Sequence, residues 1–285
     1  MQESSAEVVV VGGGVVGLAC GLALAEQGRS VRILDAGRIG GGSSHGNCGT
    51  LTPSHALPLA APGQVGRAMR WMLTPDAPLY MKPRFDPALW SWLLRFAGRC
   101  NAEAMMRSGV VRARLLQASR NTWSPKLSRM LKVPHLDKVM QPGKGYSITY
   151  SRPMLAPRRP LTLQERSVCV STWGSGYRLG STMEFSGFDT SLNQRRLAAL
   201  ERAAREYLHE GVGPVKQEEW YGWRPMMVDD VPVIGPVPGR KRQWLATGHG
   251  MLGVSMSIAT AGLVADLVTG AEPRFDPAPY RLDRF

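Results

Sequence analysis

The chain has 285 residues, of which 44% are hydrophobic and 20% charged, and Lys plus Arg outnumber Asp plus Glu by 35 to 22, a formal net charge of +13. This length and apolar content suit one large domain or two small ones with a buried core, and they exclude a wholly disordered or fibrous chain. The cations are scattered, and their densest sets are short runs such as Gly239-Arg240-Lys241-Arg242. Nucleic-acid binding is therefore disfavoured against solvated faces, an acidic membrane surface or an anionic ligand.

The amino-terminal residues predict a strand, a glycine turn, a helix and a second strand. Glu7 to Val11 is a β-branched run suited to a buried parallel strand. A helix follows through Leu18 to Ala25 and stops at Gln27-Gly28, and Val31 to Asp35 forms the second strand. The turn between the first strand and the helix has the GxGxxG spacing, with its glycines at Gly12, Gly14 and Gly17.

Each glycine of this turn has a physical reason. Gly12 permits a tight turn, Gly14 lets a pyrophosphate approach the backbone, and Gly17 lets the helix pack closely on the strand. Asp35 ends the second strand, where such folds place the carboxylate that accepts hydrogen bonds from the adenosine ribose. These residues predict dinucleotide binding, with a glycine-rich turn that holds no ligand as the alternative. They do not distinguish a nicotinamide from a flavin.

The next segment, Ile39 to Gly49, is a loop rich in glycine, serine and asparagine. Its backbone N–H groups and the side chains of Ser43, Ser44 and Asn47 can line a second phosphate or the edge of an isoalloxazine ring. The alternative is a flexible surface loop.

The middle of the chain predicts helices and short antiparallel strands. Asp86 to Arg120 has the apolar spacing of a helix, and Ser191-Leu192-Asn193-Gln194 is a capping box that opens a helix ending at His209. Between them lie three predicted strands, Tyr146 to Tyr150, Val168 to Thr172 and Tyr177 to Phe185.

The carboxyl-terminal part has the same predicted order of strand, glycine-containing turn and helix as the amino terminus. A strand over Trp244 to Thr247 runs into a turn that contains Gly248, His249, Gly250, Met251, Leu252 and Gly253, and a helix follows over Ser255 to Val268. Backbone N–H groups at such a helix start stabilise a nearby negative charge. For His249 two interpretations stay open, a role beside that charge and a structural hydrogen bond within the turn.

The cysteines and the apolar segments indicate a soluble cytoplasmic protein without a secretion signal. Cys20, Cys48, Cys100 and Cys169 are far apart and form no metal-ligand pattern, so reduced thiols and no metal site are expected. The uncharged stretch Val8 to Ala25 contains five glycines, and the acidic start lacks the positive charge of a signal peptide.

Four ordered blocks of sequence resemble the FAD-dependent D-amino-acid dehydrogenases, within the larger family that includes D-amino-acid oxidase and glycine oxidase. The chain is most similar to the branch that includes proposed hydroxyproline-epimer dehydrogenases. The blocks are Val10 to Asp35, Ser43 to Gly49 with Pro53-Ser54-His55 and Pro58 to Gly63, Pro142 to Ser147, and Gly222-Trp223-Arg224-Pro225 with Thr247 to Gly253.

The resemblance implies an α/β fold in which a Rossmann-like FAD-binding domain, residues 1–60 and 222–285, joins a reduced antiparallel-sheet substrate domain, residues 61–221. It implies that Arg224 pairs with the substrate carboxylate and that the acidic pair Asp229-Asp230 fixes a loop. Tyr146 is expected to contact the substrate through its hydroxyl, with a core tyrosine as the alternative. FAD would contact Gly12, Gly14, Gly17, Asp35, Ser43, Ser44, Asn47, Gly248, Gly250, Met251, Leu252 and Gly253.

The implied activity is oxidation of the Cα–N bond of a D-amino acid, D-proline or a hydroxyproline epimer among the candidates, by hydride transfer to the flavin. The electrons would pass to an acceptor such as a quinone, or to oxygen. The basic surface would suit peripheral contact with the anionic inner face of the plasma membrane.

One departure from the family pattern lies near residues 120–121, where relatives carry an additional stretch the size of a small domain. Either the sheet is reorganised, or the chain is an internally deleted and inactive relative with exposed strand edges. A nucleic-acid-binding module is a further rival that lacks the expected basic stripe. A dehydrogenase that binds only a nicotinamide cofactor is possible from Gly12 to Asp35 alone. This hypothesis does not explain the block that begins Thr247-Gly248-His249-Gly250.

Overall fold

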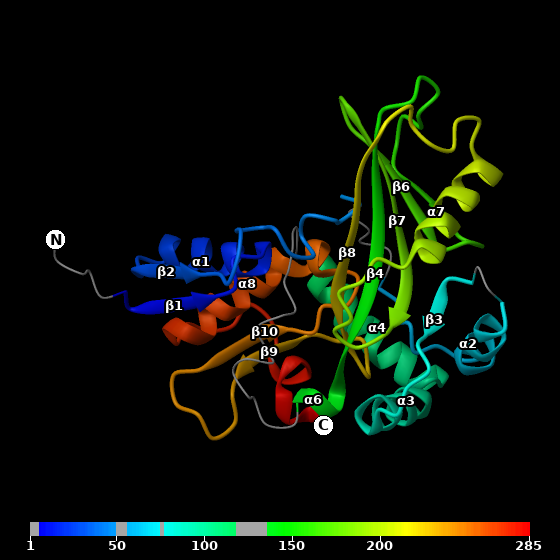
Figure 1. The fold of residues 1–285 in the computed structure, drawn as a ribbon. Helices are drawn as coiled ribbons and strands as arrows, with labels where there is room; N and C mark the ends of the chain where they lie inside the picture. Colours follow the sequence, from blue (N-terminus) through cyan, green and yellow to red (C-terminus); the bar gives the residue numbers. More distant parts are fainter. Residues whose placement is uncertain (1–5, 50–55, 75–76, 118–135) are drawn as a thin grey trace.

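The amino-terminal unit is a parallel pair of strands joined by a helix, and it lies at one end of the molecule (Figure 1). The computed structural model describes residues 6–49, 56–74, 77–117 and 136–285. β1 (Val8–Val11) and β2 (Val31–Leu34) pair in register, and α1 (Val15–Glu26) connects them. This strand, turn, helix and strand order is the predicted one.

The prediction that the first strand is buried is wrong for one of its faces. Val9 is 50% exposed, Val11 37% and Leu34 48%, whereas Val8 and Val10 on the opposite face are half-buried. The reason is that α1 covers only one face of the pair. Within the described ranges, β1 and β2 pair with no third strand.

The carboxyl-terminal elements complete this unit. β9 (Val233–Pro236) and β10 (Trp244–Thr247) form an antiparallel pair, and α8 (Gly253–Thr269) lies along α1. Two short 3-10 helices follow, η1 (Ala278–Tyr280) and η2 (Leu282–Arg284). The expected strand and helix after residue 243 are therefore confirmed.

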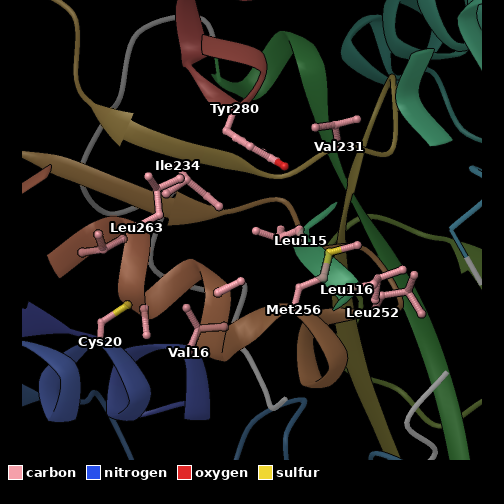
Figure 2. Close-up of a cluster of buried hydrophobic side chains, with 13 residues drawn as sticks. Val16, Cys20, Leu115, Leu116, Val231, Ile234, Leu252, Met256, Leu263 and Tyr280 are labelled. Atoms are coloured by element: carbon pink, nitrogen blue, oxygen red, sulfur yellow. The ribbon is translucent and has the colours of Figure 1, made fainter. Parts of the chain in front are cut away.

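The core of this unit is drawn from both ends of the chain, as Figure 2 shows. Val16 and Cys20 of α1 pack with Met256 and Leu263 of α8. α4 (Ala102–Gln117) joins the same cluster through Leu115 and Leu116. The domain boundaries stay a prediction, but α4 packs here although it falls within the range 61–221.

The second unit is a six-stranded sheet with one helix on a face. The strand order is β5-β6-β7-β4-β8, with β3 beside β7. The neighbours on the main path are antiparallel, and β3 is parallel to β7. The strands are β3 (Leu79–Met81), β4 (Met140–Ser151), β5 (Leu161–Leu163), β6 (Val168–Thr172), β7 (Gly176–Phe185) and β8 (Lys216–Met227). The three predicted strands are confirmed; β3, β5 and β8 were not predicted.

α7 (Gln194–Tyr207) covers one face of this sheet, where Leu197 and Leu200 pack on Ile148 and Leu179. The capping residue differs from the prediction. Asn193, not Ser191, is the N-cap, and its side chain accepts a hydrogen bond from the Arg196 N–H at 3.4 Å.

The predicted helix from Asp86 to Arg120 is two helices in the structure. α3 (Pro87–Arg99) begins after Asp86, whose carboxylate caps it, and α4 begins after Asn101, whose side chain accepts from the Ala104 N–H. A second capping residue so close to the first helix end explains the break. α2 (Gln64–Met72) and α6 (Leu136–Val139) are the other helices of the described residues.

The predicted junction near residues 120–121 lies outside the described residues, as do Pro53-Ser54-His55. No helix in the described part of the chain combines the length and the apolar character that crossing a membrane requires. All four cysteines are free, as predicted.

Candidate functional site

The glycine turn has the close approach that the fingerprint predicts. Gly12 has a φ of +115°, and a Cβ on Gly17 would lie 1.8 Å from the carbonyl oxygen of Gly12. Only hydrogen fits there, so α1 begins directly against the end of β1. Gly14 is the N-cap of α1, with no side-chain cap and no acidic residue in the first turn. The helix start is therefore open to an anion.

Asp35 lies beside this turn at the end of β2, as predicted. Its carboxylate accepts hydrogen bonds from the Gly13 N–H at 2.6 Å and the Gly37 N–H at 2.9 Å. Each carboxylate oxygen keeps further acceptor capacity, which a ribose hydroxyl can use.

The serine and asparagine loop links the two units. The Ser44 hydroxyl accepts from the Val15 N–H at 3.4 Å, at the start of α1, and the Ser43 hydroxyl donates to the Trp223 carbonyl of β8 at 2.8 Å. Arg178 of β7, which the sequence did not single out, donates to the Asn47 carbonyl at 3.1 Å. These bonds hold the loop between the fingerprint helix and the sheet.

The second glycine turn leads from β10 into α8. Gly248 and Gly250 both have positive φ, +81° and +56°, and α8 starts without a side-chain cap or an acidic residue in its first turn. Met251, Leu252 and Gly253 complete the turn, and with Gly250 they line a large cavity.

His249 is buried within this turn, and burial lowers its pKa to about 3. The Thr260 hydroxyl donates to the Met256 carbonyl at 2.8 Å, so it accepts from the Nε2–H of His249 at 2.9 Å. The imidazole is thus neutral, and its Nδ1 is a buried acceptor without a partner among the described residues. The structural hydrogen bond that was one interpretation of His249 is therefore present. The other interpretation, a role beside a negative charge, stays a prediction.

The cavity has a volume of about 910 Å³ and is lined by the second glycine turn, the sheet and helices α2 and α3, whereas no residue of the first glycine turn lines it. Among the described lining residues, Lys82, Arg84 and Arg224 carry charge, and none is acidic. Lys82 pairs with Asp189 and Arg84 with Asp86. The predicted residues that line the cavity are Ser43, Asn47, Tyr146, Arg224, Gly250, Met251, Leu252 and Gly253.

Arg224 is the cavity-lining cation without a carboxylate. Its guanidinium donates to the Thr182 carbonyl at 2.9 Å, and no salt bridge among the described residues includes it. Desolvation lowers its pKa, the sign of a charge held away from water. Gly145 makes room for it, because a Cβ there would lie 2.1 Å from a guanidinium nitrogen. A carboxylate on a ligand would supply the missing partner.

The Thr182 carbonyl, which accepts the hydrogen bond from Arg224, lies at an irregularity in the pairing of β4 and β7. The register between β4 and β7 shifts between Lys144 and Tyr146, and on β7 both Ser181 and Thr182 have positive φ, +127° and +55°. A β-branched residue rarely adopts this conformation, and bulges that turn a backbone group are frequent beside active sites.

The structure does not bring the Tyr146 hydroxyl to Arg224. Gly145 faces Arg224, and successive side chains of a strand point to opposite faces, so Tyr146 points toward α7. Its hydroxyl donates to the carboxylate of the buried Glu184 at 2.9 Å, and burial beside that carboxylate raises its pKa. Tyr146 also contributes to the cavity lining. Its substrate contact stays a prediction.

The acidic pair Asp229-Asp230 is bound in structural ion pairs, as expected for residues that fix a loop. Asp229 pairs with Arg284 at 2.9 Å, and Asp230 pairs with Arg112 of α4 and accepts from the Leu59 N–H at 3.0 Å. The sequence reasoning missed Arg112, since an arginine within a basic helical run gives no sign of a buried partner.

The two glycine turns fit a flavin dinucleotide. Gly17 and Gly12 form a turn that a Cβ would block, and two uncapped helix starts supply N–H groups. Among the described residues, no cluster of three or more His, Cys, Asp or Glu can hold a metal.

The fold and this site define a dinucleotide-binding oxidoreductase with a separate sheet over the cavity. The sequence pattern of the family "FAD dependent oxidoreductase" matches residues 7–114 and 107–267, and the chain belongs to this family, whose cofactor is FAD.

Curated relatives and solved structures agree with this assignment. The chain is 24% identical to D-amino acid dehydrogenase of Granulibacter bethesdensis, covering 98% of this chain and 99% of the relative, and 25% identical to D-amino acid dehydrogenase 2 of Pseudomonas aeruginosa, covering 94% and 96%. Glycine oxidase from Geobacillus kaustophilus has the same fold at 18% identity and a TM-score of 0.67, covering 98% of this chain and 99% of that one. Iminodiacetate oxidase from Chelativorans sp. BNC1 has a TM-score of 0.63 at 17% identity, covering 96% and 98%.

Proposed function

We propose that this protein is an FAD-dependent dehydrogenase that oxidises the Cα–N bond of a D-amino acid to the imino acid. The observation that carries the proposal is Arg224, a desolvated guanidinium in the cavity wall whose partner is a backbone carbonyl instead of a carboxylate. The curated relatives named D-amino acid dehydrogenase support the substrate class. D-proline and the hydroxyproline epimers are the first candidates among the substrates.

In this proposal the chain orients its substrate and excludes water. The Arg224 guanidinium binds the substrate carboxylate with two parallel hydrogen bonds, which fixes the direction of the Cα–H bond. The apolar lining of the cavity strengthens that ion pair by removing water. FAD, when bound, supplies the hydride acceptor. The electrons then leave to an acceptor such as a quinone.

We also propose that this chain lacks an internal segment that its relatives carry near residues 120–121. The alignment with the Granulibacter protein extends over 416 residues, which is 131 more than the 285 of this chain, and both proteins are covered almost completely. The exposed face of β1 and β2 is what a missing strand and its connections would leave behind. The alternative function is therefore that of a deleted relative without activity.

The experiment is the visible spectrum of the purified protein, recorded without oxygen before and after addition of D-proline, D-alanine or a hydroxyproline epimer. A flavin spectrum that bleaches supports the dehydrogenase. A colourless protein that added FAD does not restore supports the inactive relative. A yellow protein that no D-amino acid bleaches contradicts the proposed substrate class.

Arg224→Met tests the role of the guanidinium. Removing one partner of a buried charge pair costs about 2–5 kcal/mol, so KM should rise by about 30-fold or more while flavin content stays near that of the parent protein. Lys82→Met is the matched control, because Lys82 is a cavity-lining cation that already pairs with Asp189. An equal rise of KM in both variants would refute the assignment.

A further inference from the structure

Trp220 lies in the cavity wall on the same strand as Arg224. Trp220, Gly222 and Arg224 alternate along β8, so their side-chain positions share one face of the sheet, and all three residues line the cavity. Trp220 is half-buried. Its indole ring therefore borders the same space as the guanidinium.

Two glycines leave room for the indole ring. A Cβ on Gly222 would lie 2.1 Å from Cη2 of Trp220, and a Cβ on Gly46 would lie 2.0 Å from its Cε3. Both distances are shorter than any ordinary contact of a Cβ atom, so only glycine fits at these two positions. The six-membered ring therefore lies against the loop 39–49 at Gly46 and extends along β8 over Gly222, in the direction of Arg224.

The guanidinium of Arg224 lies beside the indole for a matching reason. A Cβ on Gly145 of β4 would lie 2.1 Å from a guanidinium nitrogen, and Gly145 is the cross-strand partner of Gly222. Side-chain positions that face each other across an antiparallel pair are about 4.5–5.5 Å apart. The indole edge and the guanidinium thus occupy neighbouring spaces over one pair of glycines. An amino acid that is bound to Arg224 through its carboxylate can rest its side chain on the ring.

The titratable groups beside Arg224 are two cysteines. Cys48 and Cys169 both line the cavity, and they are the groups whose charge would act on the guanidinium. Burial raises the pKa of Cys48 to about 12 and also raises that of Cys169, so both thiols are neutral at ordinary pH. A positively charged side chain on the ligand would therefore be desolvated here without an anionic partner among the described residues, which favours an uncharged side chain.

We propose that the indole of Trp220 binds the substrate side chain and selects apolar, ring-bearing D-amino acids such as D-proline over small ones such as D-alanine. The pyrrolidine ring of proline covers more of an indole than a methyl group does, and each buried methylene strengthens binding about 4-fold. Trp220 is thus a specificity-determining residue, and Arg224 holds the carboxylate. This inference rests on the proposed function, because it names the side chain that the same site prefers.

Isothermal titration calorimetry with two carboxylates tests the assignment without turnover. Cyclopentanecarboxylate has the carboxylate and a five-membered ring like that of proline but no nitrogen, and propionate corresponds in the same way to alanine. The parent protein should bind cyclopentanecarboxylate about 10-fold more tightly than propionate. Trp220→Ala should remove most of this preference, whereas Arg224→Met should weaken the binding of both ligands alike.

Trp220→Phe is a milder variant, and Trp173→Leu is the matched control. Phenylalanine keeps an aromatic ring of smaller area, so the preference for the cyclic ligand should fall only about 3-fold. Trp173 is 43% exposed, lies in the turn between β6 and β7 and takes no part in the cavity lining. Its variant should bind both ligands as the parent does. Circular dichroism and flavin absorbance of each variant check the fold and the cofactor content.

Three results would overturn the proposal. They are equal binding of the two carboxylates by the parent, equal weakening of both by Trp220→Ala, and a ligand preference that Trp220→Ala leaves unchanged. A flavin content that falls in both Trp220 variants while the preference stays would place the ring against the cofactor instead. If the preference follows Trp220 but no D-amino acid bleaches the flavin, the side-chain site is supported and the proposed activity is wrong.

Discussion

Gly17 shows how one missing side chain brings a helix onto a strand. A Cβ at this position would meet the Gly12 carbonyl oxygen at 1.8 Å, a backbone atom that cannot move away without opening the turn. The same backbone is the predicted phosphate site, so packing and cofactor binding are expected to depend on one contact.

Gly17→Ala should therefore lower the flavin content by about 10-fold or more and also lower the melting temperature. Flavin absorbance per protein and a thermal melt measure both effects. Gly98→Ala in α3 is the matched control, because a Cβ there meets nothing within 4 Å and alanine favours the helix by about 1 kcal/mol. A Gly17→Ala protein that keeps full flavin would contradict this account of the fingerprint.

His249 gives a prediction about pH. Its pKa falls from its usual value near 6.5 to about 3 in the folded protein because burial disfavours the charged ring. Between these pH values the unfolded chain binds more protons than the folded one, so the free energy of unfolding rises with pH. The contribution is complete above pH 6.5 and is lost as the pH falls toward 3, by about 1.4 kcal/mol per pH unit from this group.

Urea unfolding from about pH 4 to about pH 7 measures this dependence. His249→Gln keeps a donor for Thr260 but has no proton to gain, so its stability should vary less steeply with pH than that of the parent. Parallel curves for the two proteins would show that His249 does not titrate in this way.

At the residue scale, the sequence predicts the glycine turns and Asp35 because their spacing is local, and it predicts Arg224 because the block around it resembles the family's. It cannot predict that Tyr146 points away from Arg224, because this depends on the pairing of β4 with β8, whose register is set by residues far apart in the chain. Arg112, the buried partner of Asp230, was missed because the two residues are far apart in the chain.

At the scale of elements, α8 is the element on which both glycine turns depend. Its Leu263 is fully buried in the cluster that includes Val16 and Cys20 of α1. The contact couples the helix that begins at the fingerprint to the helix that begins at the second turn (Figure 2).

Leu263→Ala should reduce the free energy of unfolding by about 2–5 kcal/mol, because it leaves a cavity between the two helices, and it should weaken FAD binding as well. Urea titration and a flavin-release assay measure the two effects. Ile258→Ala changes an exposed position of the same helix and should cost about 1 kcal/mol or less. Similar losses in both variants would indicate that the α1 and α8 contact is not the source of the effect.

The sequence predicts those helices and strands that have a regular hydrophobic periodicity or a recognisable helix-capping residue. β8 was missed because Lys216, Gly222 and Pro225 interrupt any alternation, and its pairing with β4 supplies the order that its own residues do not. The break between α3 and α4 was missed because apolar spacing continues across Asn101, and only the cap geometry shows the new start.

At the scale of the whole molecule, the exposed pair of strands β1 and β2 is the feature from which we predict self-association in solution. Val9, Val11 and Leu34 leave an apolar face in water, and β1 and β2 each keep one unpaired edge within the described residues. Edges of this kind invite pairing with another chain. The family resemblance predicted the two units. The absence of the stretch that relatives carry near residues 120–121 led to the prediction of exposed strand edges.

Val9→Thr combined with Val11→Thr should weaken self-association by about 10-fold, because it makes the exposed face polar while keeping β-branched residues in the strand. Sedimentation velocity over a range of protein concentrations measures this change. Val215→Thr, at an exposed site outside this pair, should leave association unchanged. An unaltered association in the double variant would place the contact elsewhere.

The core shared by α1 and α8 has a consequence for synthesis. The ribosome completes α1 at Glu26 and does not begin α8 until Gly253, so at about 5–20 residues per second the first helix waits roughly 10–50 seconds for its partner. During that interval the face of α1 that packs on α8 lacks that partner. The nascent chain is thus a client for chaperones that bind early apolar segments, and the flavin can be captured only after most of the protein has been made.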